Sequence, residues 1–300
     1  MPQMAAGVWP AMPTPVDENR QVNLDATGQL VDALITEGTD GIYLLGATGQ
    51  GLALRLAQRQ AVAERACAKA AGRVPVIVHV GCINTDDAVE LARHAAGCGA
   101  AGISAIPPVY FGNDLATEMK HYGAIASATS LPFFPYINTM ATGEPPVAPK
   151  QYVEALLELP HITGSKITTR NLYTLGLIHH YAQDKLKLYS GADELMCHAV
   201  LCGAYGAIGS FYNIWGSVAR RARQACVEGQ MGRVQHFMGV FQGTLDEILA
   251  SGSAYKFIRQ AIHLRHDVDI GPGSVAGNTL GPEWNKADVQ RLLDVVDRAA

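Results

Sequence analysis

With 300 residues, of which 48% are hydrophobic, the chain can bury a full core and suits one barrel domain or two small ones. Its formal net charge of -4 leaves no basic stripe for nucleic acid or for an anionic membrane surface. The N-terminus has no basic region followed by an apolar run, and no apolar stretch is long enough to cross a bilayer. We therefore expect a cytoplasmic protein that acts on a small molecule.

The cysteines and histidines do not match common metal-binding spacings. The six cysteines lack C-x-x-C pairs and the density of a disulfide scaffold, so we expect reduced, buried thiols. The histidines show no H-E-x-x-H or carboxylate spacing, so solvated or hydrogen-bonded side chains are expected rather than ligands. We predict no metal site and no bound cofactor.

Short apolar runs bounded by Gly or Pro alternate with longer stretches of 3.6-residue periodicity, which is typical of repeated βα units and a parallel sheet. Runs such as GIYLLG and VPVIVHVG are continuously apolar, as expected for strands buried on both faces. Eight strands are predicted, at Val8–Met12, Gly41–Leu45, Val76–Val80, Gly102–Ile106, Phe133–Ile137, Ile162–Ile167, Leu188–Ser190 and Ala207–Gly209.

Helices are predicted between these strands, at Leu24–Glu37, Leu56–Ala70, Asp86–Ala96, Leu115–Ser127, Lys150–Leu159, Leu172–Gln183 and Asp193–Cys202. No strand signal returns after the eighth strand. Helices at Val218–Glu228, Gly232–Ala250, Ala254–His263 and Lys286–Ala299 follow there, broken by the Gly-rich stretch IGPGSVAGNTLGP. The prediction is a (β/α)8 TIM barrel over residues 1–215, with residues 216–300 as a C-terminal helical extension of the same domain.

One lysine differs from the others in its sequence context. Chemistry in such barrels sits at the carboxyl ends of the strands. Of the eight lysines, seven fall in amphipathic helices, at their edges or in polar loops, where the ammonium group is solvated. Lys166 stands in the apolar strand HITGSKI, where burial lowers the pKa of an unpaired amine. Its position alone leaves two interpretations open, a nucleophile toward a ketone or a structural ion pair.

Two further features fit chemistry at that lysine. Tyr136 ends the fifth strand, next to the Lys166 strand in barrel order, so its phenol is a candidate proton carrier; a buried core tyrosine is the alternative. The GATGQG segment, residues 46–51, lies between strand and helix, where backbone amides and the Thr48 hydroxyl suit a carboxylate. It is not a P-loop, because no Lys-Ser or Lys-Thr follows it.

Asp193 and Glu194 open the helix after the seventh strand. Their simplest role is to complement the dipole at the N-terminus of that helix. The same carboxylates are expected to face the barrel mouth, where hydrogen-bond acceptors suit a polyhydroxylated substrate. The residues alone leave both interpretations open.

Seven motifs follow one another in a fixed order: GVWPAMPTPVD, GATGQG, PPVY, PYINTMATG, GSK, SGADE and GAIGSFYN. In this order they resemble the N-acetylneuraminate lyase and dihydrodipicolinate synthase superfamily of pyruvate-dependent class I aldolases. The resemblance covers roughly Gly7 to Trp215. It implies a Schiff-base lysine at Lys166 and a proton shuttle at Tyr136. It also implies pyruvate as a small-molecule partner and a homotetramer.

The resemblance also assigns substrate-binding residues. It implies a carboxylate cradle at Ala47, Thr48 and Gly49, and it makes Tyr110 the second tyrosine, which in the synthase branch reaches a neighbouring subunit's site. Similarity to the lyase branch rests on residues that in lyases hold the hydroxylated tail of the sugar acid, here Thr168, Gly191, Asp193, Glu194 and Ser210. Ala141 stands where the synthase branch carries an arginine.

Four positions depart from the family pattern. Ala47 replaces a Ser or Thr hydroxyl, Gln50 replaces the usual Glu, and Ile137 and Thr139 break the pattern Y-N-x-P. None of them touches the lysine or the tyrosine. The iminium step is therefore expected to survive, while the aldehyde partner stays open.

The leading hypothesis is reversible aldol cleavage of a 2-oxo-3-deoxy sugar acid such as N-acetylneuraminate into pyruvate and an aldose. The alternative in the same fold is a dihydrodipicolinate synthase, or a 2-keto-3-deoxy sugar acid aldolase or dehydratase. Two hypotheses from other classes remain, a nucleotide-binding oxidoreductase based on GATGQG and a barrel that only binds pyruvate-like ligands. Ala47 and Gln50 are the hints for the last of these.

Overall fold

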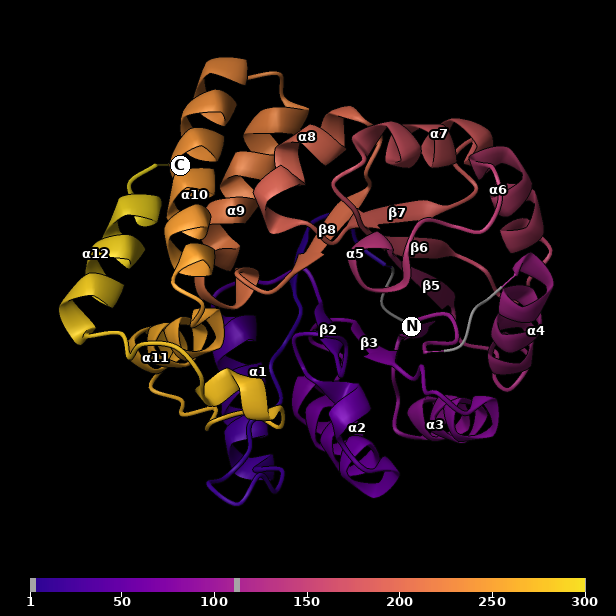
Figure 1. Cartoon of the computed structure of the whole chain (residues 1–300), viewed down its shortest axis with the longest axis horizontal. Helices are drawn as coiled ribbons and strands as arrows, with labels where there is room; N and C mark the ends of the chain where they lie inside the picture. The colour runs from indigo at the N-terminus through magenta and orange to yellow at the C-terminus, as the bar shows by residue number, and fades with distance from the viewer. Residues whose placement is uncertain (1–3, 111–113, 300) are drawn as a thin grey trace.

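Eight parallel strands form the centre of the molecule, in a computed structural model that describes residues 4–110 and 114–299 (Figure 1). They are Val8–Pro10 (β1), Ile42–Leu44 (β2), Val76–His79 (β3), Gly102–Ala105 (β4), Phe133–Asn138 (β5), Gly164–Thr168 (β6), Lys187–Ser190 (β7) and Gly206–Gly209 (β8). Their order is β1-β8-β7-β6-β5-β4-β3-β2. A parallel bridge between Ala11 and Tyr43, with Met12 N–H donating to the Tyr43 carbonyl (2.9 Å), brings β1 beside β2 and closes the barrel. The predicted (β/α)8 barrel is confirmed.

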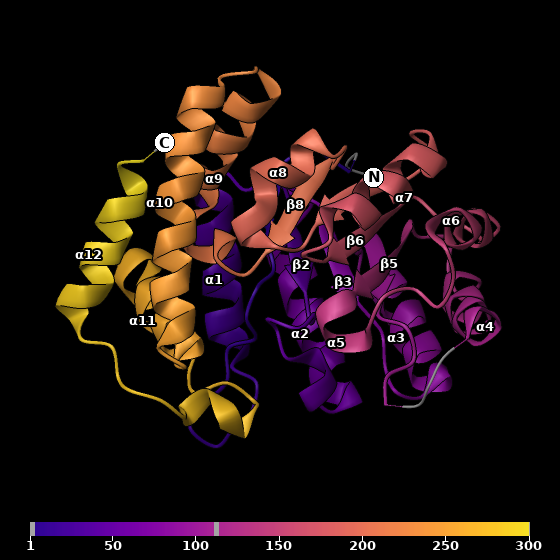
Figure 2. The same ribbon diagram turned by 45° about the horizontal axis from the view of Figure 1, so that its top comes forward.

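Helices surround the strands, as Figures 1 and 2 both show. They are Leu24–Thr36 (α1), Leu56–Ala70 (α2), Thr85–Gly97 (α3), Leu115–Ala126 (α4), Pro149–Leu157 (α6), Leu172–Ala182 (α7) and Met196–Leu201 (α8). Asparagine side chains accept from backbone amides at the N-termini of α1, α3 and α7, which satisfies donors that a helix start leaves free.

Two stretches of the barrel differ from the predicted helices. The helix predicted over Asp193–Cys202 is a 3₁₀ turn, Asp193–Leu195, followed by α8, because Met196 begins the α-helical hydrogen bonding. A four-residue helix that was not predicted, Thr139–Thr142 (α5), follows β5. Because α5 comes directly after β5, it lies at the carboxyl end of the barrel.

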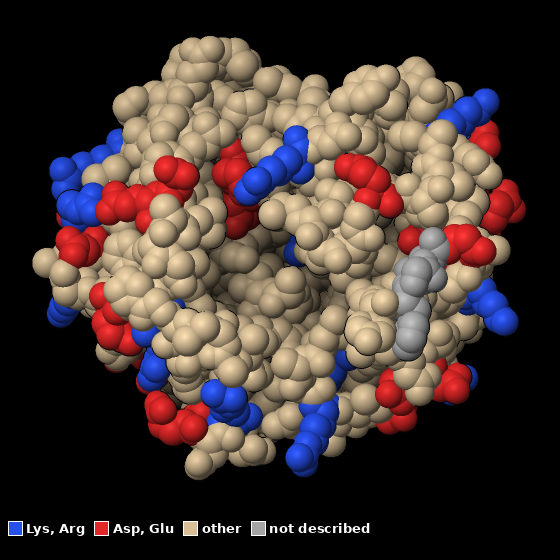
Figure 3. Space-filling view, in the orientation of Figure 1, with Lys and Arg blue, Asp and Glu red and all other residues tan. Residues whose placement is uncertain are grey.

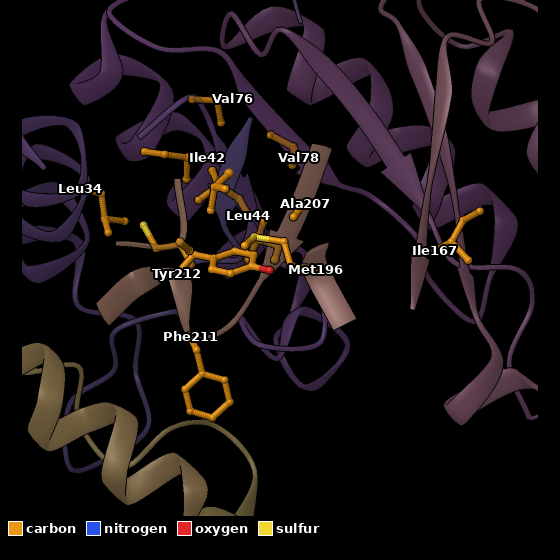
Figure 4. Close-up of a cluster of buried hydrophobic side chains, with 14 of the residues drawn as sticks. Leu34, Ile42, Leu44, Val76, Val78, Ile167, Met196, Ala207, Phe211 and Tyr212 are labelled. Atoms are coloured by element: carbon orange, nitrogen blue, oxygen red, sulfur yellow. The ribbon is translucent and has the colours of Figure 1, made fainter. Parts of the chain in front are cut away.

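The buried side chains form two layers that alternate along each strand, which explains the continuous apolar runs in the sequence. The outer layer packs between strands and helices, and Figure 4 shows part of it, with Ile42, Leu44, Val76 and Val78 on the strands. The inner layer fills the barrel and contains Met4, Trp9, Ala11, Tyr43, Ile77, Ala101, Phe134, Tyr189 and Ile208. A side chain on the inner face near a strand's carboxyl end therefore points into the barrel mouth.

The C-terminal helices gather on one side of the barrel in Figures 1 and 2. They are Tyr212–Val227 (α9), Met231–Ala250 (α10), Ala254–His266 (α11) and Lys286–Asp297 (α12), with a 3₁₀ turn at Ala276–Thr279 (η3). The first of them begins six residues before the predicted start at Val218, because a kink at Trp215 (φ -117°, ψ 30°) joins two helical pieces. Trp215 packs against Phe211, Phe241 and Phe257, which fixes the extension to the barrel.

Two negative findings follow from this architecture. Among the described residues, no helix combines the length and the apolar character needed to span a bilayer. The sheet closes on itself, so it lacks the switch point of an open doubly wound sheet at which dinucleotides bind. This removes the structural basis of the nucleotide-binding alternative.

Candidate active site

The pairing of β5 with β6 brings the two predicted catalytic residues together. Tyr136 lies opposite Lys166 in the register, and Asn138 lies opposite Thr168. Side chains two residues apart on a strand share a face, so these four form one block on the inner face of the barrel. The block stands at the carboxyl ends of both strands, where barrel chemistry is found.

Lys166 is buried, and the described part of the chain gives it no ion-pair partner. Its side chain is 4% exposed, and its Nζ lies 4.4 Å from the ring centre of Tyr43 and 4.5 Å from that of Tyr136. Within residues 4–110 and 114–299 it forms no salt bridge shorter than 4.0 Å. Burial lowers the pKa of this amine to about 8, opposed by the charge of Asp193. This environment supports a nucleophile and does not support a structural ion pair.

The phenol of Tyr136 has two polar neighbours. Its oxygen lies 3.1 Å from Oγ1 of Thr168, and Nδ2 of Asn138 donates to it at 3.1 Å. Burial raises the pKa of Tyr136 to about 12, and the hydrogen bond with Thr168 opposes that rise. The phenol is therefore protonated at rest and is placed to give and take a proton beside Lys166.

The GATGQG loop has a tightly constrained backbone. Leu45 and Gln50 adopt positive φ (61° and 51°), and a Cβ at Gly51 would overlap the carbonyl oxygen of Leu45. Thr14 Oγ1 donates to the Gly49 carbonyl (2.7 Å) and anchors the loop from below. The constrained turn leaves Ala47 and Thr48 at the wall of a pocket.

That pocket, about 230 Å³ in volume, opens at the carboxyl ends of the strands. Figure 3 shows a hollow at the centre of the face viewed in Figure 1. Thr48 Oγ1 lies 2.6 Å from Oγ of Ser210, which ties the loop after β2 to the loop after β8. The pocket is lined by Ala47, Thr48, Tyr136, Asn138, Met140, Ala141, Lys166, Thr168, Gly191, Ile208, Gly209 and Ser210. Seven of the eleven residues proposed from sequence are among them.

Four proposed residues lie elsewhere. Gly49 is buried within the GATGQG loop and does not line the pocket. Tyr110, at positive φ (80°), is 91% exposed and does not line it either. Glu194 is half-buried, and its carbonyl accepts from Nε2 of Gln242 (2.7 Å).

Asp193, the fourth, is buried behind the pocket wall. Its Oδ2 accepts from the Phe211 amide (3.0 Å), while its Oδ1 has no hydrogen-bond partner within the described residues. Burial raises the pKa of Asp193 to about 7. A Cβ on Gly209, which lines the pocket, would overlap Asp193 Oδ1. The carboxylate is therefore separated from the pocket by the backbone of one glycine.

Three residues beside Lys166 and Tyr136 were missed by the sequence analysis. Tyr43 lies under the lysine and donates to Ser104 Oγ (3.0 Å). The His79 ring stands edge-on to Tyr136, and burial keeps its pKa well below 6.5, so the imidazole is neutral. Asn138 lines the pocket. The available signal for Tyr43 was its inner-face position on a predicted strand, and for Asn138 its place two residues after Tyr136, one residue past the predicted end of that strand.

The comparisons with known proteins agree with this geometry. The model of the dihydrodipicolinate synthetase family matches residues 4–272. The chain belongs to this family. Among curated relatives, an N-acetylneuraminate lyase of Rhizobium meliloti (strain 1021) is 33% identical over 82% of this chain and 81% of the relative. Another N-acetylneuraminate lyase, from Citrobacter koseri, is 32% identical over 88% of both chains.

Two solved structures share the fold. Wild-type sialic acid aldolase of Ruminococcus gnavus superposes with a TM-score of 0.90 at 23% identity, covering 99% of this chain and 98% of the other. A prophage protein of the dihydrodipicolinic acid synthase family from E. coli K12, solved with pyruvate, gives 0.82 at 23% identity and covers 98% of both chains. At these identities the likeness supports the architecture.

Proposed function

We propose that this chain is a class I aldolase that cleaves a 2-oxo-3-deoxy sugar acid, with N-acetylneuraminate as the leading candidate, reversibly into pyruvate and an aldose. The observation that carries the proposal is Lys166, buried between the rings of Tyr43 and Tyr136 at the end of a pocket, where no described residue forms a salt bridge with it. A lysine whose pKa falls toward neutrality is a nucleophile for ketones.

The first half of the reaction joins substrate to enzyme. Neutral Nζ of Lys166 attacks the C2 ketone, and the carbinolamine forms as a proton moves from nitrogen to oxygen. Tyr136 gives its phenolic proton to the C2 hydroxyl, which leaves as water, and a protonated iminium and a phenolate remain. Thr48 and the amides of residues 46–49 are proposed to hold the substrate carboxylate.

The second half breaks the carbon–carbon bond. The Tyr136 phenolate takes the proton of the C4 hydroxyl, the C3–C4 bond breaks, and its electron pair moves into the iminium to give an enamine and the free aldose. Tyr136 then protonates C3 of the enamine. Water hydrolyses the resulting iminium to pyruvate, and the proton released returns to the Tyr136 phenolate, which restores both the phenol and the neutral amine.

The pocket lining favours a neutral, hydroxylated aldehyde. Among its lining residues Lys166 alone carries an ionisable side chain other than a tyrosine, and Met140 and Ala141 offer no cation for a second carboxylate such as that of aspartate semialdehyde. Thr168 and Ser210 provide hydroxyl groups to the pocket. We propose that they bind the sugar hydroxyls with Gly191. Asp193 and Glu194 do not line the pocket, and we propose that they act on the substrate through the loops that they hold, Asp193 through the Phe211 amide and Glu194 through its backbone contact with Gln242. The names of the curated relatives support this choice.

The proposal is tested by steady-state assays with two substrates. Purified protein is incubated with N-acetylneuraminate, and separately with pyruvate plus aspartate semialdehyde, and pyruvate release or consumption is followed. We expect turnover of the first mixture only. Turnover of the second mixture without the first would assign the chain to the synthase activity instead.

We further propose that the protein is cytoplasmic, and that the C-terminal helices belong to the same domain as the barrel because Trp215 fixes them to it.

We also propose that the protein is a homotetramer. Tyr110 is 91% exposed and suits a contact with a second copy, as the family resemblance implies. The molar mass in solution, measured by light scattering, checks the assembly. A monomer at micromolar concentration would contradict it.

A further inference from the structure

The side chain of Asn138 does not cap the helix that this residue begins. It is the N-cap residue of α5, and asparagine is among the preferred N-cap residues, yet its side chain makes no capping hydrogen bond. It turns instead into the barrel mouth, where it is 8% exposed and lines the pocket. The three asparagines that begin α1, α3 and α7 all cap their helices. The unused cap indicates that this side chain serves another contact.

That contact is the phenol of Tyr136. Nδ2 of Asn138 donates to the phenol oxygen at 3.1 Å, and Thr168 approaches the same oxygen at 3.1 Å. The amide oxygen of Asn138 is buried and has no hydrogen-bond partner in the part of the chain that the structure describes. Its hydrogen bond to Tyr136 is therefore the interaction that fixes the amide.

An N–H donor has an unequal effect on the two states of a phenol. Because the Asn138 amide donates to the oxygen, the phenol's own proton is left to point toward Thr168 or the substrate. When the proton leaves, the negative oxygen gains a charge-assisted hydrogen bond from the same N–H. The Asn138 amide therefore favours the phenolate form of Tyr136 and lowers its pKa, whereas burial raises that pKa.

We propose that Asn138 is a positioning residue for Tyr136, whose amide N–H orients the phenol and stabilises the phenolate that accepts the substrate proton. The inference rests on the proposed Schiff-base function and adds to it a residue outside the set named from sequence. Ala47 has no hydroxyl group that could contact the phenol. In this chain, Asn138 and Thr168 are the side chains that form hydrogen bonds with the Tyr136 oxygen.

Other charged and titratable groups face Tyr136 and must be considered in its pH dependence. Lys166 on β6 lies 4.5 Å from its ring, and Asp193 of the 3₁₀ turn raises its pKa. The rings of Tyr43 on β2 and His79 on β3 lie 6.4 and 6.1 Å from it. Asn138→Ala removes the amide and adds no charge, so a change in the profile of that variant reports on the amide. Asn138→Asp keeps the shape of the side chain but adds a carboxylate, which raises the pKa of both Tyr136 and Lys166.

The test uses the exchange of pyruvate methyl protons for deuterium, followed by NMR from pH 6 to pH 10. This exchange needs the Lys166 iminium and a nearby proton carrier but no aldehyde. The C3–H bond breaks, its electron pair forms the enamine, and the proton passes to the carrier before a deuteron returns. Asn138→Asp and Asn138→Ala are compared with wild type, with Asn19→Asp on an exposed loop as the matched control. Borohydride trapping of pyruvate is measured in parallel.

We expect both variants to trap pyruvate as wild type does while exchange slows about 10- to 100-fold, the effect of losing a hydrogen bond to a charged group. The profile should move to higher pH, further for Asp than for Ala, because a carboxylate opposes the phenolate. The Asn19 control should stay within about twofold. Should the alanine variant not fold, the isosteric aspartate carries the test.

Two results would overturn the inference, exchange within about twofold of wild type in the folded variants, or loss of exchange in proportion to a loss of trapping. Failure of the proposed function is seen separately, in the wild type. A wild type that is neither trapped nor active in exchange contradicts the Schiff-base chemistry. A wild type that does both but leaves N-acetylneuraminate intact contradicts the substrate alone.

Discussion

Two cavities in this molecule are lined by basic side chains that differ in whether an acidic group lies beside them. The barrel-mouth pocket, about 230 Å³, surrounds the buried amine of Lys166, which has no salt bridge in the described part of the chain. A larger cavity, about 600 Å³, lies between α11, α12 and the Gly-rich segment, and two of the cations that line it are paired with acids. There Lys256 contacts Glu283 (2.6 Å), and Arg259 binds Asp269 through two hydrogen bonds.

The difference teaches that reactivity follows the electrostatic environment and not the size of a cavity. A cation beside an acid near the surface keeps its charge and loses its nucleophilicity. A cation buried away from water with no acid beside it is pushed toward its neutral, reactive form, because burial penalises the charge. The smaller pocket is therefore the site of chemistry, and the following substitutions test this contrast.

Removing the phenol of Tyr136 should have a large effect on turnover. Tyr136→Phe is expected to lower kcat by ~10²- to 10⁴-fold, the usual contribution of a positioned proton carrier. Nζ of Lys166 stays in place, so borohydride trapping of pyruvate should persist. An unchanged kcat would assign the proton transfer to another group.

The pKa of Lys166 predicts the pH dependence of Schiff-base formation. A value of about 8 makes about a tenth of the amine neutral at pH 7, against about one part in 3,000 for an ordinary lysine. Burial disfavours the charged form, so the rate of trapping should rise about tenfold between pH 7 and pH 9 and then level off. Stopped-time trapping at fixed pyruvate measures it. A rise that continues steadily beyond pH 10 would show an unperturbed amine.

The link between the two regions should contribute less. Oε1 of Gln50 accepts from the amides of Ser274 (2.6 Å) and Val275 (3.1 Å), which ties the Gly-rich segment to the GATGQG loop. Gln50→Ala should lower the free energy of unfolding by about 1–2 kcal/mol, about 1 kcal/mol for each hydrogen bond, and raise KM a few-fold. Urea unfolding and steady-state kinetics check this against Gln29→Ala on the exposed face of α1. If Gln50→Ala and Gln29→Ala had the same unfolding free energy and the same KM, the hydrogen bonds of Gln50 would not stabilise the loop.

Substitution in the larger cavity should have the smallest effect. Lys256→Met removes a salt bridge to Glu283, whose side chain is 75% exposed, and such pairs contribute about 0–1 kcal/mol. We expect kcat and KM within about twofold of wild type. A tenfold loss of kcat would mean that this cavity takes part in the reaction.

Much of the fold and of the site was predictable from sequence because barrel order follows chain order. Once eight βα units were recognised, Tyr136 and Lys166 had to lie on neighbouring strands. Gly191 and Ser210 likewise follow strands, and the structure places both at the pocket. These positions depend on local pattern and topology, which a sequence carries directly.

Other features depend on side-chain packing and were not predictable. Nothing in the strand pattern says that Asn138 leaves its helix cap for the Tyr136 phenol, or that Asp193 turns back to the Phe211 amide. The role of the Gly-rich segment was equally hidden, because its contact with Gln50 joins residues 224 positions apart. The hydrogen-bond partner of each of these side chains depends on which polar groups lie near it in the folded protein.

The most direct measurement is borohydride reduction of the wild-type protein in the presence of pyruvate, followed by mass analysis of the peptides. We expect one reduced pyruvate adduct, located on the peptide that contains Lys166, and none in a Lys166→Met variant. An unmodified Lys166 peptide, or an adduct on another lysine, would contradict the central claim.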